Sequence, residues 1–114
     1  MRKARILVDA SPDRIHFSLA VPVDFHLEGE AWIASCPLLD VASHGSNRQE
    51  AQEMLGEALG AFLFTCYDIG TLDEVLRDCG FEASAENRYS AASTTDRLVP
   101  FQMRQQLVQA AAAH

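Results

Sequence analysis

An unbroken alternation of apolar and polar residues from position 15 to 27 constrains the fold of this chain more than any other feature. Its apolar members are Ile15, Phe17, Leu19, Val21, Val23, Phe25 and Leu27. A period of two places these side chains on one face, which predicts a half-buried β-strand. Because Pro22 has no N–H to donate, we expect the strand to lie at a sheet edge, carry a bulge or break into two pieces at this point.

Two more short strands and a long helix are predicted to follow. The sequence Glu28-Gly29-Glu30 supplies a turn, residues 31–36 return as a second strand, and residues 41–44 form a third. Asn47 and Glu50 have the spacing of a capping box at the start of a helix. From there apolar residues recur at helical spacing, namely Ala51, Met54, Leu55, Ala58, Leu59, Phe62, Leu63 and Cys66.

A second, shorter helix is expected after the long one. Thr71 and Glu74 repeat the capping spacing, and Gly80 ends the segment. Its apolar residues are Leu72, Val75, Leu76 and Cys79. Within the long helix, Gly56 and Gly60 would each lower helix stability by about 1 kcal/mol relative to alanine. These two glycines therefore predict either close packing or a local weak point.

The end of the chain is less regular. Residues 83–95 are rich in Ala, Ser, Thr and Asn and are predicted to form a loop. The following segment admits a strand over residues 98–103 or a helix over residues 102–113. Because Pro100 disfavours a helix across the first half, a strand followed by a frayed or helical tail is predicted.

These elements predict one α+β domain over residues 1–114, since a chain of 114 residues is too short for two ordinary domains. We expect a three- to four-stranded antiparallel sheet in the order β-β-β-α-α-β, with the long helix packed on one face. The N-terminal residues 1–14 would form an arm or strand. Residues 15–82 would form the core, and residues 83–114 a loop with a C-terminal strand or tail.

The chain is acidic, with 16 Asp and Glu against 9 Lys and Arg and a formal net charge of -7. Its basic residues are scattered along the sequence, so direct DNA binding is not expected. An acidic surface favours encounter with a basic protein partner, although the charge could equally serve solubility alone. No stretch approaches the roughly 20 apolar residues of a membrane span, and no signal-peptide pattern is present, which predicts a cytoplasmic protein.

Catalytic chemistry is not predicted. His16, His26 and His44 match no metal-binding spacing, and nothing near His44 completes a nucleophile pair with Ser46. The acidic residues of the long helix are expected to face water. The three cysteines form no CxxC pair and are interpreted as buried thiols, namely Cys36, Cys66 and Cys79. We therefore expect a protein that is not an enzyme and has no catalytic residue, metal site or cofactor.

Four residues are candidates for protein binding. Trp32 stands beside the acidic turn and could be either a core filler or a binding anchor, with Glu28 and Glu30 as its charged neighbours. Phe64 follows Phe62 and Leu63 on the long helix, which suggests a second buried face of that helix. Self-association into a homodimer or higher oligomer would bury this face.

The central part of the chain resembles the HicB-like family of bacterial antitoxins over roughly residues 15–82. In that family an acidic turn precedes an aromatic residue, a short strand ends at proline, and a glycine leads into a helix that begins with an acidic residue and alanine. The residues that carry the resemblance are Phe25, Glu28-Gly29-Glu30, Trp32-Ile33-Ala34-Ser35-Cys36-Pro37, Leu38, His44-Gly45, Gln49-Glu50-Ala51 and Glu57-Ala58.

The resemblance implies an antiparallel sheet with a helix on one face, similar to a truncated ribonuclease H-like arrangement. It also implies a cytoplasmic antitoxin, or antitoxin-derived protein, that binds and neutralises a small basic HicA-like toxin which cleaves messenger RNA, usually within an oligomer. Residues after Phe81 show no pair of amphipathic helices like the DNA-binding module of many members, so operator binding is not expected. The alternative is a stand-alone homo-oligomeric structural or regulatory protein with this fold and no toxin partner.

Overall fold

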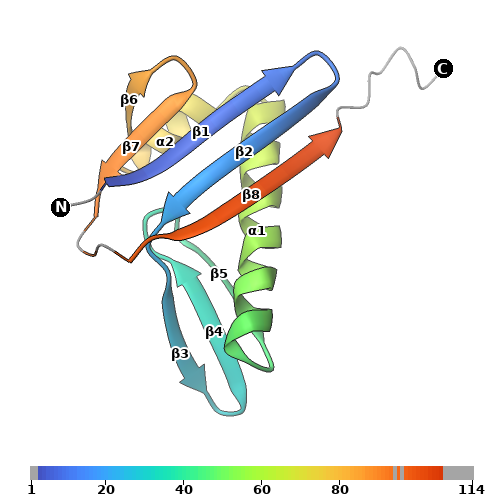
Figure 1. Ribbon diagram of the computed structural model, residues 1–114, viewed down its shortest axis with the longest axis vertical. Coiled ribbons are helices and arrows are strands. Elements are labelled where there is room, and N and C mark those ends of the chain that lie inside the picture. Colours follow the sequence, from blue (N-terminus) through green and yellow to red (C-terminus); the bar gives the residue numbers. More distant parts are fainter. Residues whose placement is uncertain (1–2, 94, 96, 107–114) are drawn as a thin grey trace.

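The computed structural model describes residues 3–93, 95 and 97–106 (Figure 1). The elements in chain order are β1 (Lys3–Ser11), β2 (Arg14–Val21), β3 (Asp24–Glu28), β4 (Ala31–Cys36), β5 (Val41–Gly45), α1 (Arg48–Asp68), α2 (Leu72–Asp78), β6 (Glu82–Ala85), β7 (Arg88–Ala92) and β8 (Val99–Gln106). The segment 3–11 is thus a strand, which decides between the arm and the strand expected there.

The strands form two antiparallel sheets. The large sheet has five strands in the order β6-β7-β1-β2-β8, and the small sheet has three in the order β3-β4-β5. The predicted α+β class, with antiparallel strands and a helix packed against a sheet, is confirmed. The predicted single sheet of three or four strands in the order β-β-β-α-α-β is wrong, because five strands precede the helices and three follow them.

The chain changes sheet at Pro22. The alternating segment breaks into β2 and β3, one of the three outcomes predicted from this proline, and the two pieces belong to different sheets. The apolar residues of β2 are buried, whereas Leu27 near the end of β3 is 57% exposed. One continuous buried face over residues 15–27 is therefore not formed.

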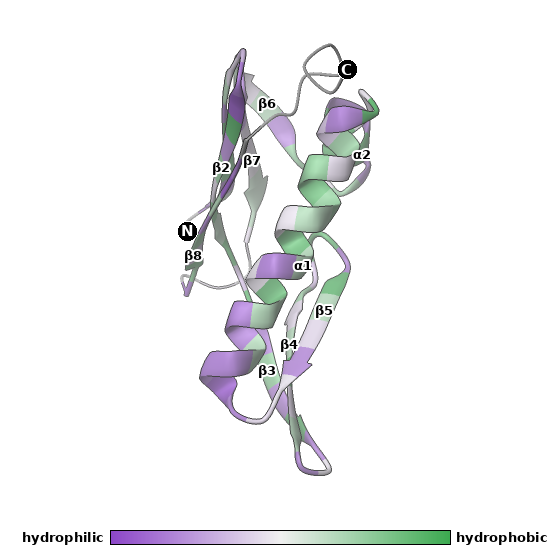
Figure 2. Cartoon of the chain, turned by 90° about the vertical axis from the view of Figure 1, so that its right-hand side faces the viewer, coloured by the Kyte–Doolittle hydropathy of each residue, from purple (hydrophilic) through white to green (hydrophobic). Residues whose placement is uncertain are grey.

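Helix α1 lies between the two sheets (Figure 2). On the large-sheet side, a Cβ built on Gly56 would lie 3.2 Å from Phe101 Cδ1, and one on Gly60 would lie 3.2 Å from Met103 Cγ. On the other side, the start of α1 packs closely against the end of β5 at Gly45. Close packing at the two helix glycines is confirmed, and the partner is strand β8.

The segment predicted as a loop at residues 83–95 contains the β6–β7 hairpin instead. Asn87, with φ of 60°, occupies the left-handed conformation that a tight turn requires and that asparagine tolerates. Tyr89 and Ala91 of β7 lie opposite Ile6 and Ala4 of β1 and face the interior. The prediction failed because small alanine and serine side chains give almost no hydrophobic alternation.

Strand β8 confirms the strand predicted before the tail. It extends to Gln106, so the alternative of a helix beginning at Gln102 is wrong over these residues. Pro100 is tolerated because β8 is an edge strand of the large sheet, where one row of backbone N–H groups needs no partner strand. The predicted frayed or helical tail over residues 107–114 lies outside the described residues.

The two predicted helix caps differ in outcome. Asn47 Oδ1 accepts a hydrogen bond from Glu50 N at 2.8 Å, and Glu50 Oε1 accepts one from Ser46 N at 2.9 Å. This cap is confirmed, with the return bond displaced by one residue. Thr71 forms no side-chain cap and donates to Cys66 O at 3.5 Å. The sequence spacing at Thr71 was therefore misleading.

The cysteines are only partly as predicted. Cys36 and Cys66 are buried, but Cys79 is half-buried at the end of α2. Burial raises the pKa of the Cys36 thiol, so it remains protonated and unreactive near neutral pH.

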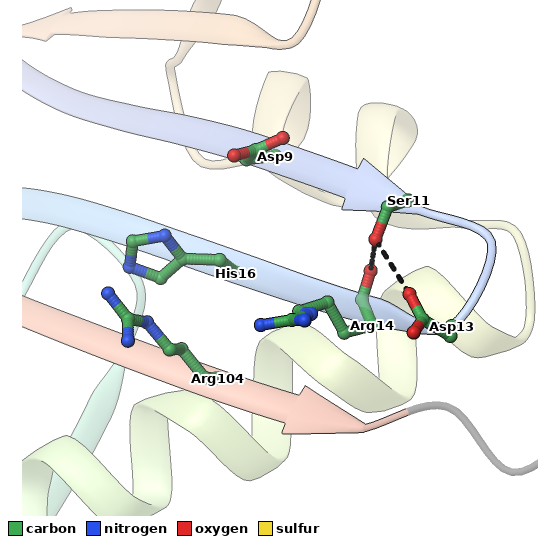
Figure 3. Close-up of a pocket in the computed structure, with 6 residues that line it drawn as sticks. All are labelled: Asp9, Ser11, Asp13, Arg14, His16 and Arg104. Carbon is green, nitrogen blue, oxygen red and sulfur yellow. Dashed lines mark hydrogen bonds between the residues drawn. The ribbon is translucent and has the colours of Figure 1, made fainter.

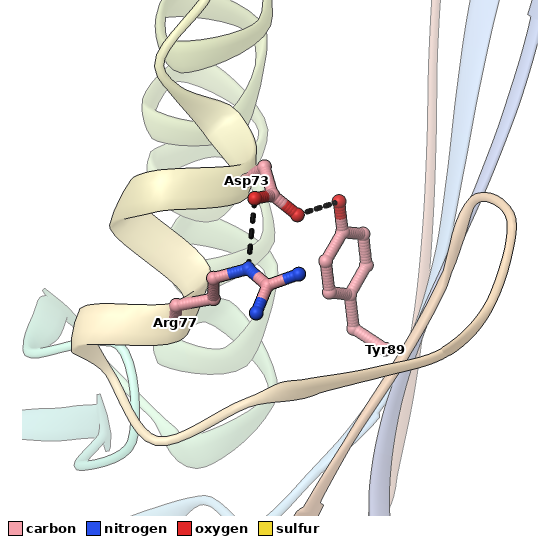
Figure 4. Close-up of polar contacts among 3 residues, drawn as sticks. All are labelled: Asp73, Arg77 and Tyr89. Atoms are coloured by element: carbon pink, nitrogen blue, oxygen red, sulfur yellow. Dashed lines mark hydrogen bonds and ion pairs between the residues drawn. The ribbon is translucent and has the colours of Figure 1, made fainter.

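A polar contact ties α2 to β7 (Figure 4). Arg77 Nε donates to Asp73 Oδ2 at 2.8 Å, and the Tyr89 hydroxyl donates to Asp73 Oδ1 at 2.9 Å. The Arg77 hydrogen bond, aided by that from Tyr89, lowers the pKa of Asp73. Burial of the ring and the neighbouring carboxylate raise the pKa of Tyr89. Both shifts favour the neutral tyrosine and the ionised aspartate that this contact requires.

Replacing Tyr89 by phenylalanine should reduce the loss of stability at alkaline pH. Because the pKa of Tyr89 is higher in the folded than in the unfolded chain, its contribution is complete below about pH 10 and is lost as pH rises through the folded pKa. The measurement is the fall in Tm between about pH 9 and pH 11. The control Asp73→Asn should retain the part of the fall in Tm that is due to burial of the Tyr89 ring. An unchanged fall in Tm in Tyr89→Phe would contradict the prediction.

Candidate protein-binding surface

The β3–β4 hairpin presents two carboxylates at its tip. Glu28 ends β3, and Gly29, with φ of 63°, allows the tight turn that leads through Glu30 into β4. Both glutamates are exposed. The hairpin projects from the end of the molecule away from the large sheet (Figure 1). The two candidate glutamates predicted from the sequence are therefore both available to a partner.

The start of α1 completes a surface around this tip. A hollow of about 550 Å³ lies between the hairpin and the first turns of the helix. The tip surface is defined here by Glu28, Glu30, Ala31, His44, Glu50 and Met54, which line this hollow. Gly45 permits the short distance between strand and helix, because a Cβ there would lie 2.5 Å from Ala51 N.

The tip surface combines negative charge with exposed apolar area. His26 Nε2 lies 3.5 Å from Glu28 Oε2, and Ser46 N donates to Glu50, so two carboxylates have one local partner each. Met54 is 37% exposed beside them, and Leu27, at the base of the turn, is 57% exposed. Apolar side chains within a charged rim are the usual composition of a protein-binding surface.

Trp32 lies behind this surface and does not line its hollow. It is half-buried on the face of β4 that also carries the buried Ala34. The Arg48 guanidinium lies 5.5 Å from the centre of the Trp32 ring and 4.5 Å from that of Phe25. Cations at these distances interact favourably with aromatic rings, so Trp32 and Phe25 hold the first turn of α1. Trp32 therefore packs partly into the core, which agrees with the first of its two predicted roles, that of a core filler.

Phe64 lies far along α1, away from the other three candidates. Its ring packs edge-to-face on Phe17 of β2, with ring centroids 5.2 Å apart. The second buried face predicted for this helix therefore exists, but the large sheet of the same chain covers it. The reason for expecting self-association through Phe64 no longer holds.

Four residues of the tip surface were not recognised as such in the sequence, namely Ala31, His44, Glu50 and Met54. Glu50 was interpreted as a helix-capping residue, which it is, and as one of the water-facing acidic residues of the helix. Met54 was assigned to the buried face of the helix. Met54 shares helical spacing with Ala51 and Leu55, which are both buried, so periodicity could not reveal its exposure. Only the position of the hairpin brings Glu28 and Glu30 beside these helix residues.

The three described histidines lie on exposed sheet faces. His26 and His44 flank Ile33 on the outer face of the small sheet, and His16 lies on the outer face of the large sheet. Across residues 3–93, 95 and 97–106, no group of three or more His, Cys, Asp or Glu side chains could hold a metal ion. Within the same residues, no helix is long and apolar enough to cross a membrane.

The fold and this site define an α+β protein with two antiparallel sheets around one helix and an exposed acidic surface at one end. Comparison of the chain with protein-family models, with curated proteins and with solved structures gives no match in any of the three.

Proposed function

We propose that this chain is a HicB-like antitoxin, or a protein derived from one, that acts in the cytoplasm by binding and neutralising a small basic mRNA-cleaving toxin. The observation that carries the proposal is the tip surface, where three exposed carboxylates, Glu28, Glu30 and Glu50, line one hollow together with the exposed Met54. A basic partner would gain both charge complementarity and apolar contact there. The role is protein binding, without catalysis.

The arrangement of residues 24–68 supports the proposal. The strands β3, β4 and β5 form an antiparallel meander, Gly45 follows, and the Asn47-capped helix α1 packs back on the sheet. This is the sheet with one covering helix that the HicB-like resemblance implies, and it contains the acidic turn and the glycine on which the resemblance rests. The large sheet lies outside residues 24–68, although its strand β2 falls within the approximate range 15–82 over which the resemblance extends.

Strand β3 offers a second means of contact beside the tip. It is an edge strand of the small sheet, and in the described part of the chain no strand pairs with its outer edge. The unpaired N–H and C=O groups of an edge strand can accept a strand from a partner. A toxin that pairs with β3 would place its basic side chains next to Glu28 and Asp24.

Binding of a small basic protein encoded by the adjacent reading frame tests the proposal. The tagged chain is co-expressed with this protein, and the complex is isolated and measured by isothermal titration calorimetry. The double variant Glu28→Lys/Glu30→Lys should bind about 10- to 100-fold more weakly, because like charges across an interface are strongly unfavourable. Growth rescue from the toxin should fall in parallel.

A matched control changes the same number of charges elsewhere. Glu74 and Glu86 are exposed on α2 and in the β6–β7 turn, so Glu74→Lys/Glu86→Lys gives the same net charge without touching the hairpin. This control should bind like the unaltered chain. Failure of the unaltered chain to bind, or equal weakening in both variants, would contradict the proposed use of the tip surface.

The alternative, a stand-alone homo-oligomeric protein without a toxin, stays a separate prediction. Sedimentation equilibrium of the isolated chain measures its oligomeric state. A stable dimer or larger oligomer that binds none of the basic proteins tested would favour this alternative over an antitoxin.

A further inference from the structure

The outer face of the large sheet gathers basic residues that are distant in the sequence. The strand registers place on this face five of the nine Lys and Arg residues of the chain, namely Lys3, Arg5, Arg14, Arg88 and Arg104. All five side chains are exposed. The only acidic residues that the described registers place among them are Asp9 and Glu82. The inference that the basic residues are scattered is therefore wrong for the folded chain.

Two of these guanidinium groups lie around one open hollow (Figure 3). Arg14 and His16 project from β2 and Arg104 from β8, and His16 lies directly opposite Arg104 in the strand register. The hollow has a volume of about 450 Å³, and Asp9, Ser11 and Asp13 complete its lining.

Few local acceptors are engaged with these positive groups. Among the described residues, neither Arg14 nor Arg104 forms an ion pair. Asp13 instead accepts a hydrogen bond from Ser11 Oγ at 3.2 Å, and His16 is hydrogen-bonded to Gln102 at 3.1 Å. Asp9 and Asp13 also line this hollow, but neither forms an ion pair with the two exposed guanidinium groups. The guanidinium donors therefore stay open to an external anion, and their geometry suits phosphate.

The basic face lies far from the acidic tip surface, although the acidic residues of α2, β6 and the β6–β7 turn lie at the large-sheet end of the molecule. The basic face lies at the end of the longest axis opposite the hairpin tip, and this axis measures 48 Å (Figure 1). Electrostatic interactions at about 0.1 M salt decay over about 10 Å. A polyanion on the large sheet is therefore screened from the carboxylates of the tip surface, despite the net charge of -7.

We infer that the outer face of the large sheet binds nucleic acid through its phosphodiester backbone, with the hollow between Arg14 and Arg104 holding a phosphate. The inner-facing position of Tyr89 leaves this face without a Phe, Tyr or Trp ring among the described residues, so it lacks the large aromatic platform on which bases usually stack. Leu7 is the one exposed large apolar residue that the described strands place on this face, and it offers little for membrane insertion. Phosphate recognition without base reading follows.

Fluorescence anisotropy with three labelled probes tests this inference on the full chain. The probes are a mixed-sequence single-stranded RNA of about 20 nucleotides, the corresponding DNA strand and the DNA duplex. Comparing them shows whether the face prefers the phosphodiester backbone of RNA or that of DNA. We expect binding at low salt that weakens between about 50 and 200 mM salt by about 100-fold for the single strands and about 500-fold for the duplex, as about five phosphate contacts require.

The double variant Arg14→Gln/Arg104→Gln should bind the single strands about 10-fold more weakly. The slope of log K against log salt concentration should become smaller by about 1.4, because each lost contact with a single strand accounts for about 0.7. Arg77→Gln/Arg97→Gln removes two charges outside this face and should bind like the unaltered chain. Circular dichroism checks the fold, and Arg5→Gln/Arg88→Gln provides a second test should the first variant not fold.

Loss of binding in the face variants but not in the control supports the inference. It is overturned by absence of binding to all three probes, by equal loss in the control, by binding to anionic phospholipid vesicles alone, or by salt-sensitive self-association without probe binding. The hairpin variant Glu28→Lys/Glu30→Lys should retain binding to nucleic acid. Failure of the toxin-binding proposal is thereby distinguishable from failure of this one.

Discussion

Replacing Phe17 by alanine should lower the free energy of unfolding by about 3–5 kcal/mol, the range for a fully buried phenylalanine. Phe17 is 0% exposed in the centre of β2, and its ring packs edge-to-face on Phe64 of α1. Removal of the ring leaves a cavity at the contact between the large sheet and the helix. Since domains of this size have a total stability of about 5–15 kcal/mol, the variant should be close to unfolded at physiological temperature.

Urea denaturation followed by circular dichroism measures this effect. Phe64→Ala is the matched control, because it removes the other ring of the same pair from a half-buried position. We expect it to cost clearly less than Phe17→Ala. A loss below about 1 kcal/mol in Phe17→Ala would show that the sheet and the helix are not packed as described.

Replacing Gly45 by alanine should cost about 2–3 kcal/mol through overpacking. The added Cβ would lie 2.5 Å from Ala51 N and 2.8 Å from Glu50 C. Both are backbone atoms in the capped first turn of α1 and cannot move without disturbing the cap. Either the end of β5 or the helix start must shift, and the tip surface would lose its shape with it.

Gly56→Ala is the control for this prediction, because it makes the same chemical change at another close contact. Its added Cβ would lie 3.2 Å from Phe101 Cδ1, an atom of a side chain that can turn slightly. The gain of about 1 kcal/mol in helix propensity should offset this contact and leave stability nearly unchanged. Equal denaturation midpoints for Gly45→Ala and Gly56→Ala would refute the steric argument.

The central part of the fold could be predicted from the sequence because its signals are local. Alternation marks β2 and β3, the acidic turn joins β3 to β4, and Asn47 with Glu50 starts α1. The division into two sheets could not be predicted, because alternation shows which face of a strand is apolar but not which strand it pairs with. Pro22 was the one indication of a break, and it did not specify a change of sheet.

The charged surfaces show the same limit. Glu28 and Glu30 could be identified because they are close in sequence, whereas Arg14 and Arg104 meet only through the pairing of β2 with β8. Met54 was misassigned, since a helix between two sheets has two buried stripes and its periodicity does not separate them from the exposed one. Contacts between distant segments determine both surfaces.

The pairing of β2 with β8 also fixes an order of events during folding. His16 and Gln102, which are hydrogen-bonded across these strands, are 86 positions apart in the chain. The small sheet and α1 come from one continuous stretch and can assemble while synthesis continues, whereas β2 lacks its outer neighbour until β8 has been made. Such long-range closure is slow, so a nascent chain exposes the bare edge of β2 and depends on rapid completion to avoid aggregation.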